Sequence, residues 1–172
     1  GGFNNAVSCP GAEDCTAGDG NCGQFGAGTT AGQTCAAAAT CIADGNGDCA
    51  IPTEFVSIAA WAFDGLESLT SVTIHSGVTS IGVFAFRGTR LTSVVLPDNL
   101  AEVPEEAFSE VTTLSSVTFG SGITTINKKA FRSTGLTSLE LPDSITELGQ
   151  YAFENCHELA FLTIGEGIDT IP

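Results

Sequence analysis

The stretch that decides the fold is Leu136-Thr-Ser-Leu-Glu-Leu-Pro-Asp-Ser-Ile-Thr-Glu-Leu-Gly-Gln-Tyr-Ala-Phe-Glu-Asn-Cys156. It opens with a Leu-x-x-apolar-x-apolar segment, continues with the spaced apolar pair Ile145 and Leu148, and then carries the dipeptide Ala152-Phe153. Neither a helical period of 3.6 nor a long alternation of 2 fits the whole stretch.

The same unit recurs through the C-terminal two thirds of the chain. The dipeptide Ala-Phe occurs five times, with steps of 23, 22, 23 and 22 residues. Its alanines are Ala62, Ala85, Ala107, Ala130 and Ala152. The Leu-x-x-apolar-x-apolar segments begin at Leu69, Leu91, Leu114, Leu136 and Leu159. Self-similarity at this period is the signature of a repeat architecture.

The repeat predicts an α/β leucine-rich repeat solenoid. A single coil of 22–23 residues cannot bury its own apolar side chains, so successive coils must stack and share one core. We expect each coil to contribute one short strand to a parallel sheet, then a second extended piece and a short helical turn at Ala-Phe. The Phe of each coil should fill the core from the wall opposite the sheet.

The run from Leu136 to Cys156 resembles a BspA-like leucine-rich repeat, the type also named for Treponema. The resemblance covers residues 51–172, about five coils with the last one incomplete. It implies a solenoid of cell-surface or secreted proteins that bind other proteins or mediate adhesion. It implies no catalytic residues and no cofactor.

Residues 1–50 form a different region, which holds 11 of the 21 glycines and no Lys or Arg. Without a hydrophobic period it has no conventional core, so cross-links must replace burial. We predict a mostly irregular, disulfide-stapled cap in which the pairing is open. Its cysteines are Cys9, Cys15, Cys22, Cys35, Cys41 and Cys49. This density of cysteines indicates a secreted, cell-surface or oxidising organelle-lumen location.

The formal net charge of -15 narrows the classes of partner. Such a charge repels phosphate backbones, so we expect no nucleic acid. It also disfavours an anionic membrane surface. No apolar run approaches the ~20 residues that span a bilayer, so we expect no membrane insertion. The resemblance to BspA-like repeats implies a protein partner, whose identity stays open.

The outward positions of the first strand are the candidate binding face. They are Ser71, Thr73, Ser93, Val95, Ser116, Thr118, Ser138, Glu140, Phe161 and Thr163. The face is rich in hydroxyl groups and nearly uncharged on an acidic molecule, and the strand face of a solenoid is its usual recognition surface. A merely solvated sheet is the alternative, because Ser and Thr also suit strands. An ice-binding surface is a third reading, but Val95, Glu140 and Phe161 interrupt the hydroxyl columns.

Other reactive residue types have structural explanations. Cys156 falls in a column of packing residues, so we interpret it as a small core residue rather than a nucleophile. His75 and His157 lie in different columns and form no catalytic pair. The turn Asp44–Asp48 starts like a calcium loop but has Cys49 and Phe55 where that loop needs Gly and Glu. We therefore predict no metal, with calcium at this turn as the alternative.

The basic residues align with acids of adjacent coils. Glu105 and Glu106 align with Lys128 and Lys129 of the next coil, and Arg132 aligns with Glu154. We expect exposed ion pairs between coils, each of which contributes well under ~1 kcal/mol to the stability of the fold.

The sequence as a whole favours a non-enzymatic protein-interaction or adhesion module. The alternative is a structural subunit of a larger extracellular or organelle-lumen assembly. In that case the open C-terminal coil would be the contact, because the sequence stops part-way through a coil at Pro172. We expect either a continuing natural chain or a partner at this end.

Overall fold

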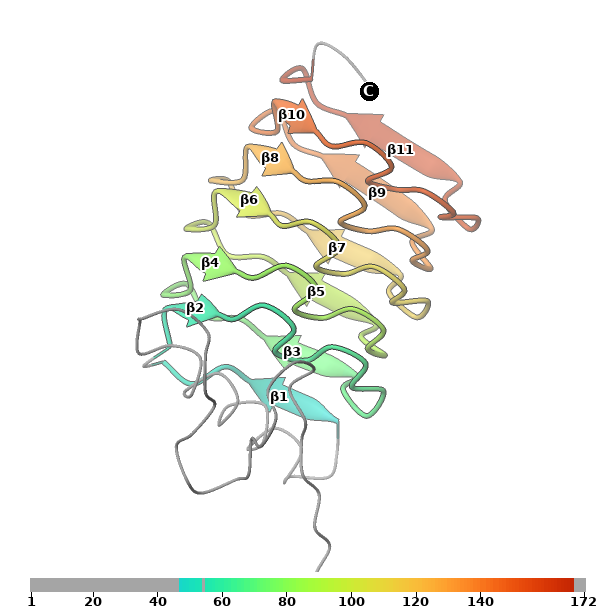
Figure 1. The fold of residues 1–172 in the computed structure, drawn as a ribbon. Coiled ribbons are helices and arrows are strands. Elements are labelled where there is room, and N and C mark those ends of the chain that lie inside the picture. The colour runs from blue at the N-terminus through green and yellow to red at the C-terminus, as the bar shows by residue number, and fades with distance from the viewer. Residues whose placement is uncertain (1–46, 54, 169–172) are drawn as a thin grey trace, which may run out of the picture.

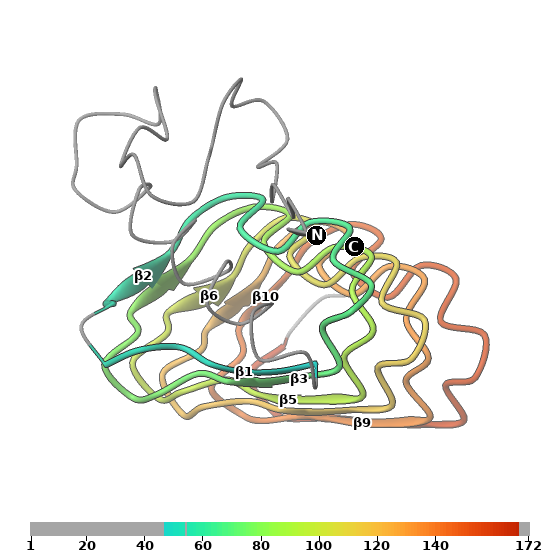
Figure 2. The ribbon, with the colours of Figure 1, turned by 90° about the horizontal axis from the view of Figure 1, so that it is seen from below.

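The computed structural model describes residues 47–53 and 55–168. They form a stack of about five coils in which successive turns of the chain lie on one another (Figure 1). Viewed along the stack, each coil has a long strand on one side, a short strand on a second side and a row of turns on the third (Figure 2). The predicted solenoid is therefore present.

The main sheet contains the predicted Leu-x-x-apolar-x-apolar segments. Its strands are β1 (Asp48–Ala50), β3 (Ser71–Thr73), β5 (Ser93–Val95), β7 (Ser116–Thr118), β9 (Ser138–Leu141) and β11 (Phe161–Ile164). Three pairs form hydrogen-bonded parallel ladders in register: β1 with β3, β5 with β7, and β9 with β11. β3 also lies against β5, and β7 against β9. The sheet begins with β1, so Cys49, which composition places in the cap, pairs with Val72 in the solenoid.

A second set of strands covers the next side of the stack. It consists of β2 (Ser57–Ile58), β4 (Ser80–Ile81), β6 (Glu102–Val103), β8 (Thr125–Ile126) and β10 (Glu147–Leu148). β2 pairs with β4, and β8 pairs with both β6 and β10, all in parallel. The second residue of each strand points inward, which accounts for the apolar-x-x-apolar pairs of the sequence.

The third side contains turns and no helix among the described residues, so the predicted helical turn at Ala-Phe is wrong. Trp61 has a φ of 56°, in the left-handed region, and the corresponding residue of every later coil also has its φ in that region. This conformation turns alternate N–H groups toward the next coil, and the Phe63 N–H donates to the Ala85 carbonyl at 2.7 Å. A helix would use these donors within its own coil.

The five Phe side chains of the Ala-Phe pairs form one continuous row. Ring centroids lie 5.0, 5.2, 5.4 and 5.7 Å apart from Phe63 to Phe153, and adjacent rings are within 7° of parallel. The first four rings are fully buried, and they belong to the same core cluster as the inward residues of the main sheet. One spine therefore runs through the whole described stack and fixes where each outward residue lies.

Much of the N-terminal region falls outside the described residues. Five of the six cysteines predicted to form disulfides, and Asp44 of the candidate calcium turn, are among them. The sixth, Cys49, is buried in β1. The disulfide-stapled cap and the calcium alternative stay predictions.

Candidate functional site

The outward positions of the main sheet share one exposed face. All ten residues singled out from the sequence are exposed, and they alternate with inward residues along each strand. Val95 pairs with Thr118, and Glu140 with Thr163, so the outward residues of paired strands lie side by side. β1 extends the face with Asp48, which sequence analysis had assigned to the cap. We call this surface the outer face.

The hydroxyl groups of the outer face differ from those beside it. The hydroxyl groups of the adjacent column form hydrogen bonds within the protein. The Thr70 hydroxyl donates to the Gly47 carbonyl, and the Ser115 hydroxyl donates to the Thr92 carbonyl. By contrast, the side chains of Ser71, Ser93, Ser116, Ser138, Thr73, Thr118 and Thr163 make no hydrogen bond to another described residue. Their donors and acceptors are available to a ligand or to water.

The acid–base pairs predicted between coils are confirmed. Lys128 lies 3.7 Å from Glu105, Lys129 lies 3.8 Å from Glu106, and Arg132 lies 3.1 Å from Glu154. Arg132 also reaches Glu110 in the preceding coil at 3.2 Å.

Two further pairs were missed, although the same column alignment contains them. Arg87 donates from Nε and Nη2 to both oxygens of Asp64, at 2.7 and 2.8 Å, and Arg90 reaches Glu67 at 3.3 Å. The hydrogen bonds to Asp64 raise the pKa of the Arg87 guanidinium above its ordinary value. With these two, all five Lys and Arg residues of the chain pair with acids, and none of the five lies in a strand of the main sheet.

The remaining candidates have structural roles. The half-buried Cys156 thiol donates to the Phe131 carbonyl and contacts the Thr134 hydroxyl. His75 bridges two backbone segments: Nδ1 accepts from the Gly77 N–H, and Nε2 then donates to the Pro52 carbonyl. In the part of the chain that the structure describes, no group of His, Cys, Asp and Glu is arranged to hold a metal ion. The same part contains no helix suited to crossing a bilayer.

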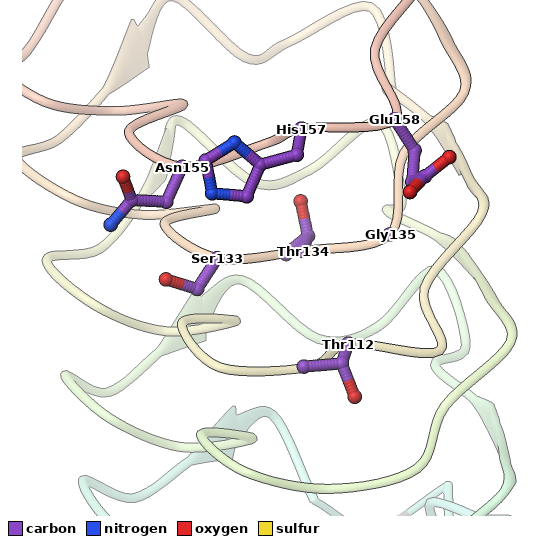
Figure 3. Close-up of a pocket in the computed structure, with 7 residues that line it drawn as sticks. All are labelled: Thr112, Ser133, Thr134, Gly135, Asn155, His157 and Glu158. Carbon is purple, nitrogen blue, oxygen red and sulfur yellow. The ribbon is translucent and has the colours of Figure 1, made fainter.

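A shallow cavity was not predicted. It has a volume of about 430 Å³, is open to solvent, and lies on the turn side between the last three coils (Figure 3). Its lining residues are Thr112, Ser133, Thr134, Gly135, Asn155, His157 and Glu158. We call it the notch. The alternating steps of 23 and 22 residues were the signal in the sequence that coils of unequal length meet here.

The repeats match a family model described as the BspA type leucine rich repeat region, in six copies over residues 47–171. The chain belongs to this family. The leucine-rich repeat protein of T. pallidum is 33% identical with a TM-score of 0.64, and the alignment covers 67% of this chain and 57% of that one. No curated protein matches the chain in sequence.

Two further solved structures are similar. A leucine rich cell surface protein of Faecalibacterium prausnitzii is 26% identical with a TM-score of 0.55, covering 73% of this chain and 40% of that one. The pneumococcal vaccine antigen PcpA is 27% identical with a TM-score of 0.64, covering 70% and 31%. This leucine-rich repeat chain thus spans between about a third and somewhat over half of the proteins it resembles.

Proposed function

We propose that this chain is a non-enzymatic protein-interaction or adhesion module of a secreted or cell-surface protein, and that it binds a protein partner through the outer face. The observation that carries the proposal is the row of exposed hydroxyl groups without partners among the described residues. They stand in register on a rigid stack, on a molecule whose net charge is -15. The cell-surface description of one similar structure supports the location.

The chemistry of the face favours a neutral, hydrogen-bonding partner surface. Ser and Thr hydroxyls both donate and accept, so they match backbone or amide groups of another protein. Val95 and Phe161 are exposed beside them and supply apolar contact area, the kind of anchor that contributes most to binding energy. Because the spine holds the strands in place, little ordering entropy is lost on binding.

The test inserts the same charge on two faces. The full chain is immobilised and screened by surface plasmon resonance against surface and secreted proteins of its native source. Ser116→Arg places a charge at the first residue of β7 on the outer face, and Ser80→Arg places one at the first residue of β4 on the second set of strands. Both serines are exposed, so neither variant should change the melting temperature.

We expect Ser116→Arg to weaken binding of the recovered partner about tenfold or more, because a buried unpaired charge costs well over 1 kcal/mol. Ser80→Arg should leave binding unchanged. Equal loss in both variants, or loss only with Ser80→Arg, would reject the outer face as the contact.

A second candidate is a structural subunit that docks through its last coil. Leu162 and Ile164 lie in β11, the last strand that the structure describes, and are 46% and 38% exposed, whereas the paired Leu139 and Leu141 are 4% and 1% exposed. This candidate predicts that Leu162→Gln abolishes assembly measured by sedimentation of the native complex, while Ser116→Arg does not. An organelle-lumen assembly has no support among the similar structures.

A further inference from the structure

The two ends of the stack are built alike. Among the residues that the structure describes, β1 is the first strand of the main sheet and pairs only with β3, and β11 is the last and pairs only with β9 (Figure 1). In the repeat, Cys49 of β1 holds the place that Leu162 holds in β11, and Ile51 corresponds to Ile164. A terminal coil has a neighbour on one side only, so its apolar side chains should be partly exposed on the other.

The two ends nevertheless differ in burial. In the last coil Leu162 and Ile164 are 46% and 38% exposed, as expected of an uncovered end. In the first coil Cys49 and Ile51 are only 3% and 5% exposed, although no described coil precedes β1. The first coil is therefore covered on the side that faces away from the stack.

The covered surface extends beyond the main sheet. Ile58 is buried in β2, and Phe63, the first ring of the Phe row, is fully buried on the turn side. Phe153, the ring at the other end of the row, is only partly buried. A part of the chain outside the described residues therefore covers all three sides of the first coil.

Cys49 supplies a second, independent observation. It is disulfide-bonded, and the other cysteine in the described part of the chain, Cys156, is a free thiol. The partner of Cys49 is therefore one of the five cysteines in residues 1–46. At the place of Cys49 the later coils have aliphatic residues, namely Val72, Val94, Val117, Leu139 and Leu162. Packing alone therefore does not require a cysteine here.

We propose that residues 1–46 dock on the outer end of the first coil and are linked to it by a disulfide between Cys49 and one of their five cysteines. This segment joins the described part at Gly47, beside β1, so its attachment point lies at this end. Forming the bond joins two Sγ atoms and releases two protons and two electrons. The oxidant is a disulfide of an oxidising compartment, which is reduced to two thiols.

The docked segment closes the N-terminal end of the stack. The coil of β11 is then the open end of the described stack, and a partner that stacks on a coil has access only there. The docking surface lies at the end of the stack and not on the outer face, so this proposal is independent of the proposed function.

The first test maps the disulfide in the full chain, produced by secretion and analysed without reduction after free thiols are blocked. Cleavage before aspartate releases residues 48–63 as one peptide, in which Cys49 is the only cysteine. The other five cysteines of the N-terminal region are in peptides 1–13, 14–18 and 19–43. We expect mass spectrometry to recover 48–63 joined to at least one of these three. Free 48–63, or 48–63 joined to itself or to the peptide that contains Cys156, would overturn the proposal.

The second test measures whether the linked segment covers the first coil. Cys49→Val removes the sulfur and keeps the aliphatic side chain that later coils have at this place. Cys156→Thr is the matched control, because it removes the free cysteine and introduces a residue found at the same place in two other coils. Amide hydrogen exchange is followed at Ile51, whose N–H donates to the Thr73 carbonyl at 2.9 Å, and at Gly165 in the last coil.

We expect Cys49→Val to accelerate exchange at Ile51 about tenfold or more, because losing a structural disulfide destabilises the region that it holds. Exchange at Gly165 should stay the same, and Cys156→Thr should leave exchange at Ile51 unchanged. Reduction of the wild-type chain gives the same comparison without a substitution. Unchanged exchange at Ile51 after loss of the disulfide, or equal acceleration in Cys156→Thr, would show that the segment does not cover this end.

Discussion

The Phe row makes Phe108 the most informative single position in the stack. It is fully buried in the middle coil and stacks on Phe86 at 5.2 Å and on Phe131 at 5.4 Å. If the coils share one spine, truncating this side chain removes contacts with both neighbouring coils at once. We therefore predict a large loss in the free energy of unfolding for Phe108→Ala.

The magnitude follows from burial and stacking. Replacing a fully buried Phe by Ala costs about 3–5 kcal/mol, including the cavity that is left. Phe108→Leu retains apolar volume but loses two aromatic contacts of ~0.5–1.5 kcal/mol each, so it should cost about 1–3 kcal/mol. The control is Phe161→Ala in β11, where the ring is 75% exposed and the change should stay within about 0.5 kcal/mol.

The assay is urea unfolding of the full chain, followed by far-ultraviolet circular dichroism and by fluorescence of the single tryptophan, Trp61. Trp61 stacks on Phe84 at 5.6 Å on the turn side, so it reports on unfolding at a distance from the substituted residue. The two signals should change together. A loss in Phe108→Ala no larger than that in Phe161→Ala would refute a shared aromatic spine.

Three more substitutions test other parts of the structure. Arg87→Met should destabilise the chain by about 1–3 kcal/mol in thermal unfolding, because it leaves the Asp64 carboxylate, only 8% exposed, without its donors. Gly65→Ala should cost about 1 kcal/mol in the same assay from backbone strain alone, since φ is 68° and no atom lies near the added methyl. Hydrogen bonds from Ser121 lower the pKa of Asp98, so its contribution to stability is present above the ordinary carboxyl pKa and is lost on acidification. Asp98→Asn should therefore flatten the fall in melting temperature between about pH 5 and about pH 3, and an unchanged slope would contradict the assignment.

The buried inward positions could be predicted because every coil packs against its neighbours in the same way. Leu91, Leu114 and Leu136 occur at one place in the repeat, and all three are fully buried. The outward residues then follow from strand alternation. The same column logic predicted the pairs of Lys128 and Arg132 with acids of adjacent coils.

The turn side could not be read from the sequence in the same way. A left-handed residue usually shows itself as glycine, but here Trp61, Glu106 and Lys129 take that conformation. Hydrogen bonds to the next coil hold them there, and such bonds leave no local sequence pattern. The notch was missed for a related reason. The alternation in repeat length is visible in the sequence, but the position of the notch beside Gly135 follows only from how adjacent loops lie in the structure.

Amide hydrogen exchange is the most direct test of the stacked coils. The N–H groups of Phe63, Phe86, Phe108 and Phe131 each donate to the next coil, at 2.7, 2.9, 2.9 and 2.9 Å. If the coils share one spine, these amides are strongly protected, and protection recurs in every coil at the repeat spacing and is strongest in the middle coils. Exchange of the four Phe amides at unprotected rates, or protection confined to one block of the chain, would contradict it.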